Sequence, residues 1–221
     1  MAGSPSYGVP GGAPGAGARP QPGSGVALVV VDMINAMRFP GADAMASAAV
    51  GAAEVIADLR RDADRLGVPV VYVNDNDGQW HAERSRIVEA CRDAGDVQRR
   101  LLDLIAPRHD DYFIIKPQLS GFYATSLEVL LSQLGARRLV MTGMATEICV
   151  QFTAADAHMR GYDLWAPGNA TASARPEHQD WALQIMRRSF GAEIAPTTAL
   201  TLAGWADAAS SRPAGPWNRN P

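Results

Sequence analysis

Runs of apolar residues alternate with amphipathic stretches along this chain, and the alternation predicts strands separated by helices. Residues 26–31 (VALVVV) and 68–73 are near-continuous apolar runs, as expected of parallel strands that are covered on both faces. Four more strands are predicted, at 111–116, 139–141, 162–166 and 193–196.

Segments of helical composition lie between these strands. Gly67 stands where a glycine commonly ends a helix, and Gly95 divides a second helical stretch into one or two helices. The predicted helices cover 43–66, 83–106, 125–134, a stretch from Thr146, 176–190 and 198–208. Strands that alternate with helices throughout predict an α/β fold with a parallel sheet and helices on both faces.

The chain is predicted to contain one folded domain. Residues 1–25 are mostly Gly, Pro, Ala and Ser, and such a segment buries too little apolar surface to offset its ordering entropy. We therefore expect a disordered tail at 1–25, a domain at 26–209 and a second loose tail at 210–221.

Composition and charge exclude several classes of protein. The net charge is −3 with mixed signs, so no basic stripe predicts nucleic-acid binding. No apolar run is long enough to span a membrane, and a signal peptide is not expected, because no basic region followed by an apolar one stands at the N-terminus. The two cysteines have neither disulfide-framework nor zinc-site spacing, which favours a reducing cytoplasm.

Three reactive side chains are predicted at the carboxyl ends of strands, where sites of parallel sheets lie. Asp32 follows the first apolar run and can accept a proton from a nucleophile or orient a base. Lys116 ends the third strand, where its charge can hold Asp32 ionised and stabilise a thiolate. Cys149 belongs to the turn and helix that follow the fourth strand.

Cys149 is the candidate nucleophile. Thr146 is placed to cap the helix, so Cys149 falls in its first turn, near amide groups that carry partial positive charge. We expect this position to lower the thiol pKa from about 8.5 to roughly 3.5–7.5.

Each of these residues also has a plainer interpretation. Asp32 can tether a loop, Lys116 can be solvated at a strand end, and Cys149 can be a small buried apolar residue. The three together are more specific than any one of them. Cys91 lies within a predicted helix and is assigned to packing.

The segments around these three residues resemble those of a known protein superfamily. Asp32 after VALVVV, Lys116 in FIIKPQLSGFYAT and Cys149 in TGMATEICVQFTAADAHMRGY resemble the isochorismatase-like cysteine hydrolase superfamily, with a likeness from about residue 26 to 206. The resemblance implies a three-layer α/β/α Rossmann-like sandwich with a six-stranded parallel sheet. It also implies a catalytic triad of Asp32, Lys116 and Cys149, and a homo-oligomer, either a dimer or a tetramer.

The same resemblance implies a cis peptide bond between Met144 and Ala145. The backbone N–H groups of Ala145 and Cys149 would then form an oxyanion hole. The implied reaction is hydrolysis of a small-molecule amide or carbamoyl substrate through a thioester.

Neither a metal nor a cofactor is expected. After the second strand the chain reads NDNDGQWH, and it lacks the Asp-x-His pair of the superfamily's nicotinamidases, although Asp75, Asp77 and His81 are present. No GxGxxG follows the first strand, which removes the main support for a dinucleotide.

Six further residues are candidates for the substrate pocket, with ordinary packing or loop roles as the alternative. They are Phe39, Asn76, Trp80, Phe122, Tyr123 and Thr146.

Three functions remain open from the sequence. The leading hypothesis is a cofactor-free cysteine hydrolase acting on a C–N bond. The second is hydrolysis of an isochorismate-type vinyl ether that uses Asp32 and Lys116. The third is a non-catalytic protein or a thiol-based redox sensor.

Overall fold

The computed structural model describes residues 25–210, and the side chains of residues 25–208. Six parallel strands form one sheet in the order β3-β2-β1-β4-β5, with β6 beside β4. The strands are β1 (Val26–Val31), β2 (Val70–Asp75), β3 (Tyr112–Lys116), β4 (Arg138–Met144), β5 (Asp163–Trp165) and β6 (Thr171–Ala172).

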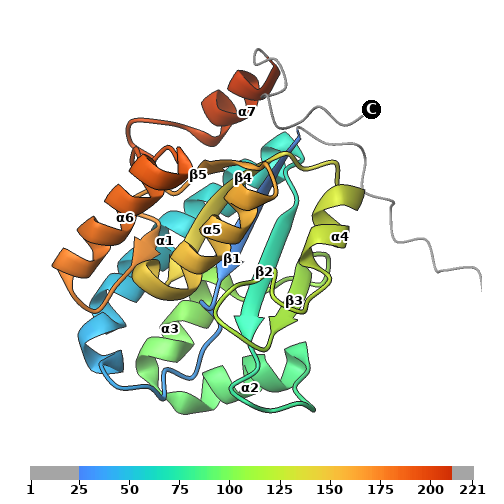
Figure 1. Ribbon diagram of the computed structural model, residues 1–221. Helices are drawn as coiled ribbons and strands as arrows, with labels where there is room; N and C mark the ends of the chain where they lie inside the picture. Colours follow the sequence, from blue (N-terminus) through green and yellow to red (C-terminus); the bar gives the residue numbers. More distant parts are fainter. Residues whose placement is uncertain (1–24, 211–221) are drawn as a thin grey trace, which may run out of the picture.

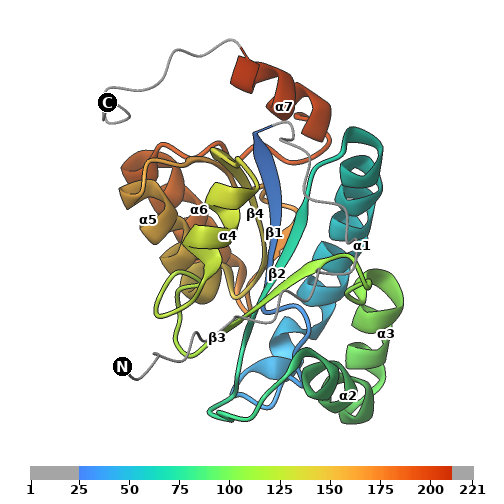
Figure 2. The ribbon, with the colours of Figure 1, turned by 90° about the vertical axis from the view of Figure 1, so that its right-hand side faces the viewer.

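Helices cover both faces of the sheet (Figures 1 and 2). They are α1 (Ala42–Leu66), α2 (Arg84–Ala94), α3 (Asp96–Ile105), α4 (Leu127–Gln133), the π-helical turn η1 (Thr146–Val150), α5 (Gln151–Met159), α6 (Pro176–Phe190) and α7 (Leu202–Ser210). In Figure 2, α1, α2 and α3 lie on one side of the sheet, and α4, α5 and α6 on the other. The predicted three-layer α/β/α sandwich is confirmed.

The pleat of β1 divides the apolar core into two halves. Leu28 and Val30 face the cluster that contains α1 and α3, whereas Val29 and Val31 face the cluster beneath α4 and α5. All six residues of β1 are buried, which is why this strand reads as a continuous apolar run. The central position of β1 also places the residue that follows it, Asp32, at the middle of the sheet edge.

Several predicted boundaries agree with the structure. α1 ends at Gly67, whose φ of 65° is left-handed and whose N–H donates to the Ala63 carbonyl. The stretch 83–106 forms two helices that are separated at Gly95. The fourth helix begins at Leu127, whose N–H donates to the Thr125 hydroxyl.

The predicted sixth strand at 193–196 is wrong. Only Glu193 pairs with the sheet, through a single bridge to Trp165, and the sixth strand is β6. Pairing does not extend along the segment to Pro196, which has no N–H to donate to a ladder.

The tails predicted at 1–25 and 210–221 lie outside the described residues, apart from Gly25 and Ser210. The Gly25 carbonyl accepts hydrogen bonds from the amides of Arg137 and Arg138, which fixes the entrance to β1. None of the helices within residues 25–210 is both long enough and apolar enough to cross a membrane.

Candidate active site

Asp32 is held by the backbone of β2. Its own N–H donates to the Val73 carbonyl at 2.8 Å, and its Oδ1 accepts the amide of Asp75 at 2.7 Å. The backbone of Asp32 has a φ of 52°, a left-handed conformation that is uncommon for a residue other than glycine. This turn at the end of β1 leaves Oδ2 free to face Lys116.

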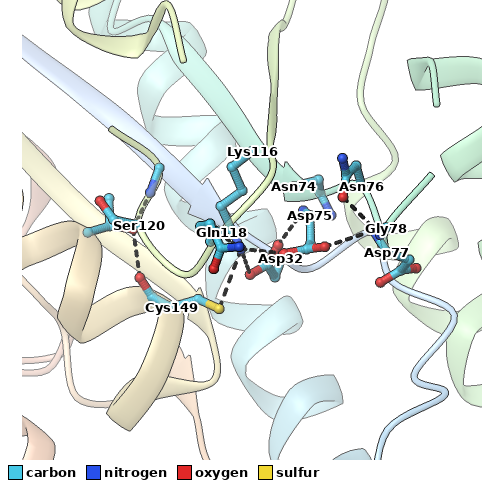
Figure 3. Close-up of polar contacts among 12 residues, drawn as sticks. Asp32, Asn74, Asp75, Asn76, Asp77, Gly78, Lys116, Gln118, Ser120 and Cys149 are labelled. Carbon is cyan, nitrogen blue, oxygen red and sulfur yellow. Dashed lines mark hydrogen bonds and ion pairs between the residues drawn. The ribbon is translucent and has the colours of Figure 1, made fainter. Parts of the chain in front are cut away.

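Lys116 is the centre of the polar cluster in Figure 3. Its side chain is fully buried, and its Nζ lies 2.9 Å from Asp32 Oδ2 and 3.2 Å from Asp75 Oδ2. The same nitrogen lies 3.1 Å from the Gln118 carbonyl and 3.5 Å from Cys149 Sγ. An ammonium has three protons to donate, so four acceptors compete for them. The longest of the four contacts is the one to sulfur, and it can shorten when the thiol loses its proton.

The turn that carries Cys149 depends on a close approach between two strands. Gly143 has a φ of 113°, and a Cβ at this position would lie 2.0 Å from the Val31 carbonyl oxygen. Only glycine fits there. The peptide bond between Met144 and Ala145 is cis, and the chain then enters η1, which carries Cys149.

Thr153 ties this turn to the loop after β3. Its buried hydroxyl donates to the Cys149 carbonyl at 2.6 Å and accepts the Gly121 amide at 3.0 Å. A Cβ on Gly121 would lie 2.8 Å from Val73, so the loop packs tightly against the sheet. One hydroxyl thus couples the backbone of Cys149 to the loop that starts at Lys116.

A second set of hydrogen bonds fixes the other side of the turn. The Thr146 hydroxyl donates to Gln179 Oε1 at 2.5 Å, and Gln179 Nε2 donates to the Gly168 carbonyl and to Thr171. Ser173 Oγ lies 2.5 Å from a carboxylate oxygen of Glu147. The turn is therefore anchored to α6 and β6.

Thr146 does not cap the helix, contrary to the sequence prediction. No side chain caps η1, which Ala145 precedes, and Thr146 is the first residue of the turn. The hydroxyl of Thr146 is engaged by Gln179, so it is not available to the amides of the turn.

Burial and the neighbouring charges set the protonation of the cluster. Burial raises the pKa of Asp32, although Lys116 opposes this. Burial also disfavours the ammonium of Lys116, but the charges of Asp32, Cys149 and Asp75 outweigh it and raise the pKa of Lys116 above its ordinary value. Lys116 is therefore an ammonium, and its charge favours the ionised form of Asp32 against the effect of burial.

The thiol behaves differently from the sequence prediction. Burial and the carboxylate of Asp32 raise the pKa of Cys149 to about 12, although Lys116 acts in the opposite direction. The expected lowering is wrong because position in a helical turn reveals neither burial nor the adjacent carboxylate. Cys149 is a thiol in the resting structure, and its proton can pass to Asp32, with which it shares a hydrogen bond.

The six pocket candidates occupy different environments. Trp80 and Tyr123 are exposed, at 82% and 59%, and Phe39 packs at the margin of the core. Asn76 is buried and its Oδ1 accepts the Gly78 amide, whereas the Phe122 ring is covered by Tyr162 and Arg160. A substrate pocket lined by these six residues, among which the Thr146 hydroxyl is bound to Gln179, stays a prediction. The oxyanion hole of Ala145 and Cys149 also stays a prediction.

Asp75 is one of the site residues that the sequence interpretation does not identify. It pairs in register with Lys116 across β2 and β3, and its carboxylate contacts the ammonium. Its position is a signal, because Asp75 ends a strand just as Asp32 follows one, but the NDND pattern around it suggests only a metal ligand. Among residues 25–208, no group of three or more His, Cys, Asp or Glu side chains is arranged to hold a metal ion.

Comparisons with known proteins agree with this fold. The chain is 38% identical over 168 residues to an uncharacterized isochorismatase family protein, YaaI, of Bacillus subtilis, covering 76% of this chain and 92% of that one. It is 32% identical over 206 residues to the ureidoacrylate amidohydrolase RutB of Azorhizobium caulinodans, covering 79% and 90%. The crystal structure of N-carbamoylsarcosine amidase from Thermoplasma acidophilum superposes with a TM-score of 0.57 at 30% identity, covering 78% and 96%.

A family model described as the isochorismatase domain matches residues 26–199, which is most of the part that the structure describes. The match includes the positions of Asp32, Lys116 and Cys149. The chain therefore belongs to the isochorismatase family of hydrolases.

Proposed function

We propose that this hydrolase cleaves the C–N bond of a small amide or carbamoyl compound through a thioester on Cys149. The observation that supports this most is the position of the Lys116 ammonium, which lies 2.9 Å from Asp32 and 3.5 Å from Cys149. A base, a cation and a nucleophile within contact of one another are what acyl transfer through sulfur requires.

The first half of the reaction forms the thioester. Asp32 takes the thiol proton, and Lys116, which keeps its charge, stabilises the thiolate while it attacks the substrate's carbonyl carbon. Backbone amides of Ala145 and Cys149 receive the oxyanion in this scheme. The tetrahedral intermediate collapses, the C–N bond breaks, and protonated Asp32 returns its proton to the leaving nitrogen.

The second half hydrolyses the thioester. Asp32 takes a proton from water, the hydroxide adds to the thioester carbonyl, and the C–S bond breaks. The sulfur recovers the proton, so the enzyme returns to its resting state. The products are a carboxylic acid, or a carbamic acid that decomposes, together with ammonia or an amine.

A thiol whose pKa is raised to about 12 is compatible with this scheme. Transfer of the proton from Cys149 to Asp32 leaves the net charge of the site unchanged, and Lys116 can pair with either anion. The same raised pKa speaks against a redox sensor, because oxidation of cysteine follows its thiolate character and exposure.

Two relatives support the choice of substrate class. The names ureidoacrylate amidohydrolase and N-carbamoylsarcosine amidase both describe hydrolysis at an amide-type C–N bond. We therefore place ureido, carbamoyl and simple amide compounds first among the substrates to be tested. Action in the cytoplasm stays a prediction.

Ammonia release from a panel of such compounds tests the proposal. The wild-type chain should hydrolyse at least one of them, and Cys149→Ala should abolish that activity while Cys91→Ala retains it. Hydrolysis of isochorismate that survives Cys149→Ala, with no amide hydrolysis by the wild type, would favour the vinyl-ether alternative. Asp32→Asn should remove either activity.

A further inference from the structure

The side chain of Gln179, near the start of α6, joins the turn η1 to β6 and to the segment before it. α6 packs beside α5, the helix that continues η1 (Figure 1). The Thr146 hydroxyl donates to Gln179 Oε1 at 2.5 Å, and the Ser173 hydroxyl lies 3.0 Å from the same oxygen. Gln179 Nε2 lies 2.9 Å from the Gly168 carbonyl, and 3.2 Å and 2.9 Å from the carbonyl and hydroxyl oxygens of Thr171. Both ends of the amide are therefore engaged.

The partners of Gln179 fix the orientation of its amide. A carbonyl oxygen can only accept a hydrogen bond, so the carbonyls of Gly168 and Thr171 require the NH₂ group. The reversed amide would set its oxygen against both of these carbonyls. The amide oxygen must therefore face Thr146, whose side chain is fully buried.

Thr146 lies between the two backbone amides that the proposed reaction assigns to the oxyanion, those of Ala145 and Cys149. It directly follows Ala145 and precedes Cys149 by three residues. The Ala145 carbonyl also accepts two later amides of the turn, at 3.1 Å and 3.2 Å. The hydrogen bond to Gln179 therefore fixes the chain on the carboxyl side of Ala145.

Cys149 itself is held by other groups. The Thr153 hydroxyl donates to the Cys149 carbonyl at 2.6 Å, and the sulfur lies 3.5 Å from Lys116 Nζ. Loss of the Gln179 amide should therefore release the Ala145 end of the turn and leave the sulfur with its charged partner.

We propose that Gln179 is a positioning residue, which acts through Thr146 to hold the Ala145 N–H where the oxyanion forms. This inference rests on the proposed function, because acyl transfer is what generates an oxyanion at this point. Removal of an oxyanion donor costs about 10²–10³ in kcat and a misplaced group about 10², so loss of the Gln179 amide should cost roughly 10- to 100-fold. An interaction made only in the transition state lowers kcat and kcat/KM equally, so KM should not change.

Two reactions of Cys149 separate the position of the oxyanion donor from the reactivity of the sulfur. Hydrolysis of the best substrate in the amide panel passes through an oxyanion. Alkylation by iodoacetamide forms a C–S bond at a saturated carbon while the C–I bond breaks, and no oxyanion arises. A readout of both reactions therefore distinguishes a positioning role from a merely structural one.

Gln179→Met keeps the length of the side chain and removes its hydrogen bonds. It should lower kcat for hydrolysis roughly 10- to 100-fold, and it should leave KM and the alkylation rate of Cys149 unchanged. Gln184→Met makes the same change at an exposed position of α6 and is the matched control, with neither rate altered. Circular dichroism and urea unfolding verify that each variant is folded.

Variants of Thr146 test the route by which Gln179 acts, and they answer the question if Gln179→Met does not fold. Thr146→Val removes the hydroxyl and should slow hydrolysis as Gln179→Met does, whereas Thr146→Ser should retain the wild-type rate. The Gln179→Met/Thr146→Val double variant should be no slower than the slower single variant, because both changes remove the same hydrogen bond.

The outcomes distinguish this inference from the proposed function. A wild-type kcat in folded Gln179→Met and Thr146→Val, with hydrolysis still abolished by Cys149→Ala, would overturn the inference alone. Alkylation that slows as much as hydrolysis would also overturn it, because the sulfur itself would then be displaced. Amide hydrolysis that survives Cys149→Ala would overturn the proposed function and this inference with it.

Discussion

Replacement of Asp32 by asparagine should have opposite effects on catalysis and on the chemical reactivity of Cys149. The carboxylate is one of the two main causes that raise the pKa of the thiol, whereas the adjacent Lys116 lowers it. Asp32→Asn removes the negative charge but leaves a side chain of similar size. The Lys116 ammonium then lies beside the sulfur with one fewer anion to neutralise its charge.

The size of the effect follows from the contact distances. A neighbouring charge in contact shifts a pKa by about 1–3 pH units, so the pKa of Cys149 should fall from about 12 by this amount. The fraction of thiolate at pH 7.5 then rises 10- to 1000-fold by the same estimate. Nucleophilicity falls with pKa, with a Brønsted coefficient of about 0.4–0.5, so alkylation should accelerate roughly 3- to 50-fold.

Iodoacetamide labelling of Cys149, followed by mass spectrometry of its peptide, measures this change, while ammonia release reports the loss of hydrolysis. Asp111→Asn is the matched control, because Asp111 also forms a buried ion pair, with Arg60 at 2.8 Å, away from the site. Labelling of Cys149 that is slower in Asp32→Asn than in the wild type would refute the reasoning. It would show that Asp32 already withdraws the thiol proton in the resting enzyme.

Four further predictions concern the same site. Lys116→Met should lower kcat/KM for amide hydrolysis at least about 10²-fold, since the thiolate loses its cation; a change below tenfold in a folded variant would contradict this. Gly143→Ala should destabilise the fold by more than about 3 kcal/mol in urea unfolding, because its Cβ would overlap the Val31 carbonyl, whereas Gly51→Ala, which meets nothing within 4 Å, should not. Thr153→Val should cost about 1–3 kcal/mol in the same assay and reduce kcat, because the buried Gly121 amide loses its acceptor and the Cys149 carbonyl loses the hydroxyl that donates to it; rescue by Thr153→Ser is expected. In a pH profile of kcat/KM, the acid limb should lie above pH 3.8, because Asp32 must be ionised to act as a base and its pKa is raised; a limb at or below 3.8 would argue against this role.

Much of the fold could be predicted because parallel strands that are buried on both faces leave a continuous apolar signal. β1, with all six residues buried, is the clearest case. β6 has only two residues, Thr171 and Ala172, which is too short to produce any periodic pattern. The segment at 193–196 has a stronger local preference for a strand, yet Glu193 alone reaches the sheet.

For the candidate site, the sheet topology predicts which residues come together but not their protonation. Strand ends meet at one edge of a parallel sheet, and this rule brings Asp32, Lys116 and Cys149 together from distant parts of the chain. The sign of the pKa shift at Cys149 could not be obtained in this way, because it depends on burial and on a carboxylate more than 100 residues earlier. Gln179 was missed for a similar reason, since its contact with Thr146 joins two helices and leaves no local motif.

The central claim is that Cys149 carries the acyl group during turnover. Acid-quenched reactions with the best substrate of the amide panel, analysed by mass spectrometry, test it most directly. The account predicts an adduct with the mass of the acyl portion on the peptide of Cys149 and none on that of Cys91. Amide hydrolysis that persists in Cys149→Ala, or an acyl adduct on another residue, would contradict it.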